Sequence, residues 1–301
     1  MGSLPPLMPR LPAGAPRAER MDRLAWRAGA CFASHGVRIG VRSNDPRVLD
    51  ALPALLPPGS LPESSAIVEE VFSVWVNASA GGTARHVRIY GGTRRLGCSS
   101  ELARALPSLE SALRLKVAEA SPERVFVHAG VVAWRGRAIL VPGRSHSGKT
   151  TLVAELVKAG ASYLSDEFAP LDQEGRVHPF AKPLTIRAGC DVHVRRCRAE
   201  ELGGTVAEGA LPVALVAFAE YRKDASWQPT TLSHGQGVLA MLAHTVPARR
   251  RPEAALEALD HALADAMLLQ GERGEAGATA RRLLETIEGR APESDAGREG
   301  P

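Results

Sequence analysis

The segment 138–150 reads AILVPGRSHSGKT and is the strongest fold signal in the chain. Residues 143–150 match the pattern G-x-x-x-x-G-K-[ST] in full, and an apolar, strand-like run precedes them. Residues 151–159 follow with the apolar spacing of a helix that stops at Gly160. A strand, a glycine-rich loop and a helix in this order direct backbone N–H groups and the positive end of a helix dipole at one point. The sequence therefore predicts a phosphate-binding loop on an α/β scaffold.

Every position of this loop is a candidate for binding the phosphate chain of ATP. Lys149 would reach the β- and γ-phosphates, and the Thr150 hydroxyl would be a ligand to Mg²⁺. A Cβ at Gly148 would stand where the chain passes closest to phosphate, so Gly148→Val is expected to abolish nucleotide-dependent thermal stabilisation. The predicted cofactor-binding residues are Gly143, Arg144, Ser145, His146, Ser147, Gly148, Lys149, Thr150 and Thr151.

Two carboxylates follow the next predicted strand, residues 161–164. This strand is expected to lie beside the strand that leads into the loop, and to deliver Asp166 and Glu167 next to the γ-phosphate. Phosphoryl transfer needs a group that orients and deprotonates the attacking hydroxyl, and acidic ligands that hold the metal. Exposed turn residues are the alternative interpretation of this Ser-Asp-Glu sequence.

Residues 121 to about 190 resemble the HPr kinase/phosphorylase family, in particular the HPr-kinase-like proteins that carry a different N-terminal domain. The resemblance rests on residues 128–130 (HAG), 143–150 and 163–168 (YLSDEF), where the family has a His-Gly motif, the phosphate loop and a paired Asp-Asp. It implies an α/β fold with a P-loop nucleotide-binding core of the HPr kinase C-terminal and PEP carboxykinase-like type. It also implies that Asp166 is the general base and that Glu167 lies near Mg²⁺.

The same resemblance extends to a short strand at residues 182–187. The family strand carries an arginine, so Arg187 is a candidate for stabilising charge on the transferring phosphoryl group, and Lys182 is a second candidate. For His128 three roles stay open: support of the base, contact with phosphate, or a buried structural histidine. The predicted catalytic residues are Asp166, Lys149, Arg187 and His128; the predicted Mg²⁺ ligands are Thr150 and Glu167.

Two departures from the family pattern limit what the resemblance implies. Thr151 stands where the family usually has Glu, and Thr185 stands where an acidic residue is expected. Both concern the phosphorylase direction, so we expect only an ATP- and Mg²⁺-dependent kinase, acting on a hydroxyl, with serine favoured, of a small protein or peptide. A small-molecule kinase and a non-enzymatic nucleotide-binding regulatory module are the alternatives. Residues 188–210 match the family's acceptor-binding segment only in position, so the acceptor stays open.

The basic charge balance does not indicate a nucleic-acid partner. The chain has 37 Lys+Arg and 33 Asp+Glu, a net charge of +4 and a pI near 9.1. Residues 1–42 alone hold seven arginines and two acidic residues, a net +5, so the remaining residues carry −1. Residues 43–301 thus have no basic stripe that would bind the phosphate backbone of a nucleic acid.

The chain is expected to contain two folded domains. We predict a disordered lead at 1–18, an N-terminal α/β domain of unknown role at 19–120, a kinase domain at 121–290 and a disordered tail at 291–301. The expected strands are 37–41, 71–76, 87–90, 125–128, 131–133, 138–141, 161–164, 182–187 and 213–218. The expected helices are 45–56, 108–120, 151–159, 235–243, 252–269 and 276–287.

Other features indicate a reduced, cytoplasmic protein. The four cysteines are widely spread, and Cys190, His193 and Cys197 fit no common zinc spacing. The longest apolar run, residues 213–219, has about seven residues against the ~20 of a membrane span. The arginine run 249–251 is either a solvated face or a phosphate-sensing lid. A homo-oligomer is compatible with the sequence.

Overall fold

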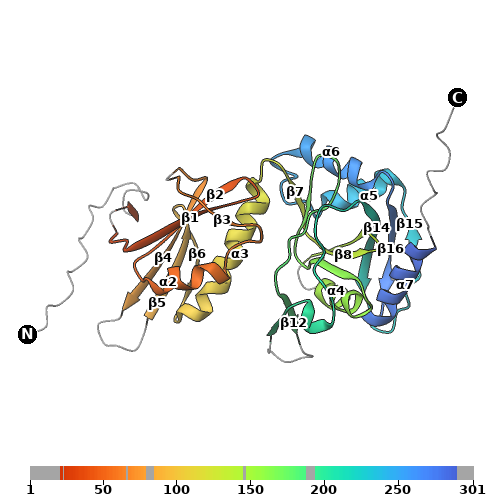
Figure 1. Ribbon diagram of the computed structural model, residues 1–301, viewed down its shortest axis with the longest axis horizontal. Coiled ribbons are helices and arrows are strands. Elements are labelled where there is room, and N and C mark those ends of the chain that lie inside the picture. The colour runs from red at the N-terminus through yellow and green to blue at the C-terminus, as the bar shows by residue number, and fades with distance from the viewer. Residues whose placement is uncertain are drawn as a thin grey trace, which may run out of the picture. The chain divides into compact units, whose positions relative to one another are not determined.

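The computed structural model describes residues 21–22, 24–65, 67–78, 85–144, 147–187 and 194–289. The chain folds as two compact units, Met1–Val117 and Ala118–Pro301 (Figure 1). Both units combine helices with β-sheet, so the molecule has the mixed α/β character expected from its sequence. The terminal segments that were predicted to be disordered, 1–18 and 291–301, lie outside the described residues.

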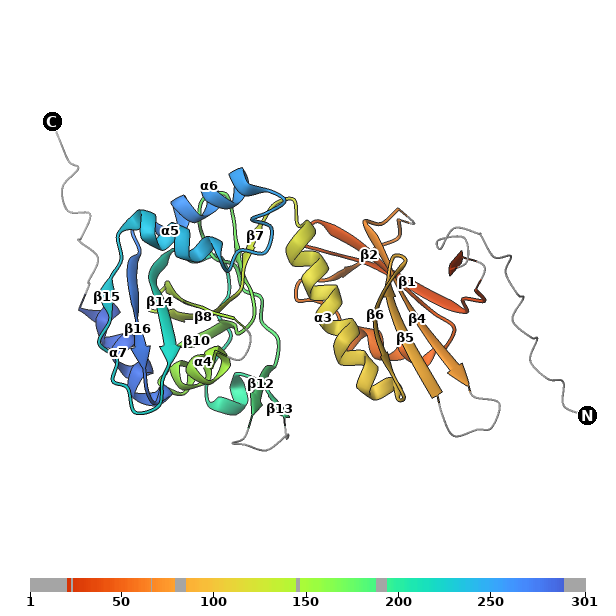
Figure 2. The ribbon, with the colours of Figure 1, turned by 180° about the vertical axis from the view of Figure 1, so that it is seen from behind.

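The first unit is built on a six-stranded mixed sheet in the order β3-β1-β2-β4-β5-β6. Its only described parallel pair is β2 with β4, and the short helix α2 (Arg47–Ala51) belongs to the connection between them. Helix α3 (Leu102–Ala120) lies along the sheet in both views (Figure 2) and buries Leu109, Leu113 and Val117, which are spaced at i, i+4 and i+8. The strands are β1 (Ala28–Ser34), β2 (Val37–Ser43), β3 (Leu61–Pro62), β4 (Glu70–Ala78), β5 (Arg85–Gly91) and β6 (Arg94–Ser99).

The second unit is built on a six-stranded sheet in the order β10-β8-β9-β14-β16-β15. Strand β8 is antiparallel to both β9 and β10, and β14 is parallel to both β9 and β16. The carboxyl ends of β10, β9, β14 and β16 therefore meet at one edge of the sheet. These strands are β8 (Ala129–Trp134), β9 (Arg137–Pro142), β10 (Ser162–Ser165), β14 (Val213–Tyr221), β15 (Thr230–Thr231) and β16 (Met267–Arg273).

Helices cover both faces of this second sheet (Figures 1 and 2). Helix α4 (Lys149–Lys158) and α7 (Ala276–Glu288) share one apolar core with Ile139 and Val141. Helix α5 (His234–Leu242) and α6 (Pro252–Leu263) share a second core with Ala138 and Leu140. Alternate residues of β9 thus face opposite layers, which explains why the strand is apolar after Arg137. Two small antiparallel pairs complete the unit: β7 (Val125–Val127) with β11 (Ala169–Leu171), and β12 (Leu184–Arg187) with β13 (Val194–Cys197).

Two predictions about this unit are wrong. Strand β10 does not lie beside β9, because β8 pairs with both of them and separates them. The predicted helix 252–269 ends at Leu263, and residues 267–273 form β16. Leu268 and Leu269 belong to the two different cores, which is the alternation of a strand buried on both faces.

Candidate functional site

The loop at residues 143–150 connects the end of β9 to the start of α4. Gly148 is the N-cap of α4 and has φ = +81°, a left-handed conformation that favours glycine. At Gly143 a Cβ would collide with Ser147 Oγ and would crowd the side chain of Lys149. The local geometry therefore favours glycine at both positions of the pattern. Ser145 and His146, two of the predicted binding residues, lie outside the described residues.

Lys149 points back into this loop. Its Nζ donates to the carbonyl oxygens of Gly143 at 2.7 Å and Arg144 at 2.8 Å, and the residue is 7% exposed. Burial lowers the pKa of Lys149 to about 8, while the charges of Asp166 and Glu167 act to raise it. The ammonium is thus held by carbonyl dipoles in a desolvated place, where an anionic ligand would bind it more strongly than carbonyls do.

His128, between β7 and β8, is fixed to the same loop. Its Nδ1 lies 2.8 Å from the carbonyl oxygen of Gly143, and its own carbonyl accepts from the Gly143 N–H at 3.3 Å. A carbonyl only accepts, so Nδ1 is the protonated ring nitrogen. Burial, and then the charge of Lys149, lower the pKa of His128, which keeps the ring neutral at pH 7. These contacts are to the loop backbone, so the neutral ring orients the carbonyl that Lys149 also uses.

The acidic pair lies at the sheet edge where β10 ends. The Ser165 hydroxyl accepts from the backbone N–H groups of Glu167 and Phe168, both at 3.1 Å, and fixes the bend after the strand. Asp166 is 6% exposed and its Oδ2 accepts from the Thr150 hydroxyl at 3.1 Å. The burial of Asp166 excludes the interpretation of this residue as an exposed turn residue. The structure thus places the predicted base, Asp166, directly after the end of β10 and next to Thr150, a predicted metal ligand in the first turn of α4.

Two further side chains hold Asp166. Lys182 Nζ lies 2.8 Å from Asp166 Oδ1 and 3.7 Å from Glu167 Oε2, so this lysine spans both carboxylates. The Tyr163 hydroxyl lies 3.2 Å from Asp166 Oδ1 and 2.9 Å from the Lys182 carbonyl. Burial raises the pKa of Tyr163 well above its usual value, and the charge of Asp166 acts in the same direction. The sequence predicts Lys182 only as a second candidate for stabilising charge on the transferring phosphoryl group and predicts no role for Tyr163, because neither contact with Asp166 follows from spacing.

The remaining predicted residues are less closely associated with this centre. Arg144 and Thr151 have exposed side chains on the loop and the first turn of α4. Arg187 is the last residue of β12, and its side chain lies outside what the structure describes, so its role stays a prediction. In the described part of the chain, no group of three or more His, Cys, Asp or Glu residues is arranged to hold a metal ion. Cys197 is buried, whereas Cys190 and His193 fall outside the described residues.

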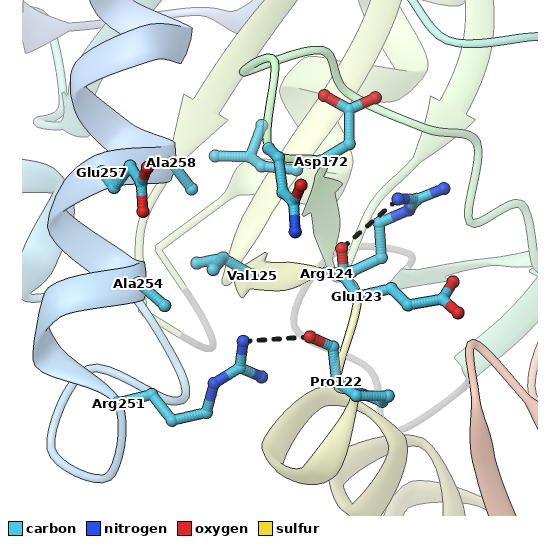
Figure 3. Close-up of a pocket in the computed structure, with 11 residues that line it drawn as sticks. Pro122, Glu123, Arg124, Val125, Asp172, Arg251, Ala254, Glu257 and Ala258 are labelled. Atoms are coloured by element: carbon cyan, nitrogen blue, oxygen red, sulfur yellow. Dashed lines mark hydrogen bonds between the residues drawn. The ribbon is translucent and has the colours of Figure 1, made fainter.

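The arginine run contacts another part of the unit. Arg250 pairs with Glu119 at 3.2 Å. Arg251 donates to the carbonyl oxygens of Ser121 and Pro122, and Figure 3 shows the second of these contacts. Arg251 lines a hollow of about 70 Å³ beside α6, to which none of the predicted site residues contributes. This is well under the roughly 300–1,000 Å³ of small-molecule pockets. The contacts of Arg250 and Arg251 therefore do not support a phosphate-sensing lid.

Comparisons with known proteins add no family to this geometry. No protein-family model matches the chain, and no curated protein matches it significantly. Among the helices that the structure describes, none combines the length and the apolar character that crossing a bilayer requires.

Proposed function

We propose that the second unit is an ATP- and Mg²⁺-dependent kinase domain with a P-loop core. It would transfer the γ-phosphoryl group to a hydroxyl, with serine favoured, of a small protein or peptide. The observation that carries the proposal is the hydrogen bond between Thr150 and Asp166. It joins the last residue of the G-x-x-x-x-G-K-[ST] pattern to the acidic pair, two motifs that are 16 residues apart in sequence.

The residues around this bond have the chemistry that a nucleotide and a magnesium ion need. A hydroxyl and carboxylate oxygens are the hard ligands that Mg²⁺ prefers. The cradle at Gly143 and Gly148 has no room for a Cβ, and Lys149 supplies a desolvated cation beside it. When bound, MgATP supplies the phosphoryl group and a counter-charge to the carboxylates. The chain's own part is to bind the phosphates with Lys149 and the loop N–H groups, and to orient the acceptor hydroxyl.

The two carboxylates have two possible assignments. By the family resemblance, Asp166 is the general base and Glu167 faces the metal. The hydrogen bond from Thr150 favours the reverse, because in P-loop enzymes the Ser/Thr hydroxyl and an aspartate share the metal side. The side chain of Glu167 is 21% exposed against 3% for Asp166, which leaves Glu167 nearer to an incoming acceptor.

Transfer of label from ATP to serine-containing protein and peptide acceptors tests the proposal. We expect Lys149→Met to lose ATP binding, and Lys158→Met, a matched change of the exposed lysine on the same helix, to bind and transfer normally. Removal of the base should reduce kcat by about 10²–10⁴-fold with the Mg²⁺ requirement unchanged. Removal of the metal-side carboxylate should instead raise the Mg²⁺ concentration for half-maximal rate. Asp166→Asn and Glu167→Gln, assayed in parallel, decide between the two assignments.

The same assay separates the alternatives. Phosphorylation of a metabolite extract without added protein would favour a small-molecule kinase. Tight ATP binding with no transfer to any acceptor, and Asp166→Asn without effect in cells, would favour a nucleotide-binding regulatory module. An active preparation that transfers nothing while Asp166→Ala keeps full ATP turnover would refute the kinase.

A further inference from the structure

Arg273 is the last residue of β16, and its side chain contacts the loop at Gly148. Its Nη2 donates to the carbonyl oxygen of Gly148 at 3.0 Å, and its Nη1 donates to that of Gly274 at 3.1 Å. The guanidinium carbon lies 5.4 Å from the centre of the Tyr221 ring. Arg273 is 2% exposed, so the second unit carries a fully enclosed cation next to the N-cap of α4.

The charge of this cation is poorly compensated by the residues around it. Among the described residues its hydrogen bonds go only to backbone carbonyls and none of the carboxylates pairs with it, while its Nε is buried without a hydrogen-bond partner. Burial lowers the pKa of Arg273, although Tyr221 and Glu275 act in the opposite direction. A buried charge without a counter-charge is costly, and proteins usually avoid it.

The position of the guanidinium adds a second unfavourable interaction. The N-terminus of a helix carries partial positive charge, so a cation belongs at the other end. Here Arg273 touches the residue that caps α4, and Lys149 is the first residue of the same helix. Two enclosed cations, Lys149 and Arg273, and the positive end of α4 are therefore all adjacent to the same loop. A polyanion bound at that loop would be attracted by all three.

We infer that Arg273 is a positioning residue for the phosphate chain of a nucleotide: it anchors the Gly148 peptide to β16 and supplies positive charge beneath the loop. This inference rests on the proposed nucleotide site and needs no transfer step. Arg273 would not touch the ligand. It would make the loop favour anions in proportion to their charge, so its effect should grow from adenosine to ADP to ATP.

Calorimetric titration of the full chain with adenosine, ADP and ATP in the presence of Mg²⁺ tests the inference. We expect Arg273→Met to weaken ATP binding about tenfold or more, ADP binding less, and adenosine binding not at all. Arg273→Lys, which keeps the charge, should recover most of the ATP affinity. Arg282→Met removes another arginine that donates to a backbone carbonyl, that of Trp227, and should bind ATP as the unmodified chain does.

The melting temperature of the ligand-free variants separates this role from a merely structural one. Arg273→Met removes an uncompensated buried charge, and the Gly148 carbonyl keeps its helical bond from the Leu152 N–H, so ligand-free stability should not fall. A structural brace predicts the opposite: a lower melting temperature with an unchanged ratio of ATP to adenosine affinity. That result, or normal ATP binding by Arg273→Met, overturns the inference. If Arg273→Met does not fold, Arg273→Gln, which keeps polar hydrogens for the carbonyls, serves for the same comparison.

Failure of the inference and failure of the proposed function give different results. If the unmodified chain binds ATP and Arg273→Met weakens that binding, the inference stands even when no acceptor is phosphorylated. If the unmodified chain binds no nucleotide, both are overturned.

Discussion

The lowered pKa of Lys149 leads to a prediction about proton uptake on ATP binding. Because burial lowers its pKa to about 8, about half of the molecules hold a neutral amine at pH 8. A bound phosphate chain favours the ammonium and raises that pKa, so ATP binding should take up as much as about half a proton at pH 8 and much less at pH 7. Titration calorimetry in buffers of different ionisation enthalpy measures this uptake.

Two lysine variants control the proton measurement. Lys158, whose side chain is 51% exposed on the same helix, can be changed to Met without loss of the uptake. Lys149→Met should abolish it together with most of the binding. Identical binding enthalpies in every buffer at pH 8 would contradict the assignment of Lys149 as a neutralised amine in the ligand-free protein.

Gly148 is close to Arg273 as well as being part of the predicted phosphate loop. A Cβ at this residue would meet the Arg273 guanidinium. The residue also has φ = +81°. Gly148→Ala should therefore lower the free energy of unfolding by more than the roughly 1–2 kcal/mol of a left-handed non-glycine residue, and should also lose nucleotide-dependent stabilisation. Denaturant unfolding with and without ATP measures both effects.

Gly136 offers a matched control for the Gly148 variant. It lies in the turn between β8 and β9 with φ = +75°, and a Cβ there would meet nothing within 4 Å. Gly136→Ala should lower the free energy of unfolding only by the cost of a non-glycine residue in the left-handed conformation, and should leave the stabilisation by ATP intact. Equal losses in the two alanine variants would show that contact with Arg273 contributes nothing.

At the level of helices and strands, local pattern predicted most elements but not their neighbours. The strand, loop and helix around residues 138–158 follow directly from the sequence. The predicted helix 108–120 begins earlier, at Leu102, and contains Pro107, which lacks the N–H for one helical hydrogen bond and would by its local preference favour a later start. The end of the predicted helix 252–269 is instead β16, since an apolar run buried on both faces has no periodicity that distinguishes strand from helix.

The site residues also differ in whether local sequence pattern can predict them. Lys149, Thr150 and Asp166 could be found from motifs because their functional spacing is local to one strand-loop-helix unit and the strand after it. Arg273 could not, because it ends β16, a strand that the sequence does not predict and whose first three residues fall in the predicted helix 252–269. The available signal was its place at the carboxyl end of a parallel strand, the edge where α/β sheets bind ligands, but this required the topology.

The packing of α4 on the sheet gives a prediction at the element scale. Gly130 in β8 lies beneath α4, and a Cβ there would collide with Val153 Cγ2. Gly130→Ala should therefore destabilise the second unit by about 1–3 kcal/mol through overpacking. Because Val153→Ala removes the colliding methyl groups, the double variant should be less destabilised than the sum of the two single variants. If the losses of unfolding free energy in the two single variants add up to the loss in the double variant, α4 accommodates the new Cβ by shifting on the sheet without an energetic cost.

On the scale of the whole molecule, the described structure is two separately cored units with one candidate site. All of the site residues that the structure describes, from His128 to Arg273, belong to the second unit. The basic excess of the chain lies in residues 1–42, which belong to the first unit. In the second unit, the enclosed cations next to the loop are Lys149 and Arg273, and the N-terminus of α4 adds partial positive charge.

This separation predicts where ATP stabilises the protein. A ligand at about 100 times its Kd stabilises the unit that binds it by about 2.7 kcal/mol, which slows hydrogen exchange through global opening roughly 100-fold. We expect such slowing for the core amides of β8, β9 and α4, and unchanged exchange for those of β4 and β5 in the first unit. Lys149→Met with ATP should show no slowing in either. Equal slowing in both units of the unmodified chain would mean that they open as one cooperative structure, because binding energy gained at the loop can reach β4 and β5 only through a shared unfolding transition.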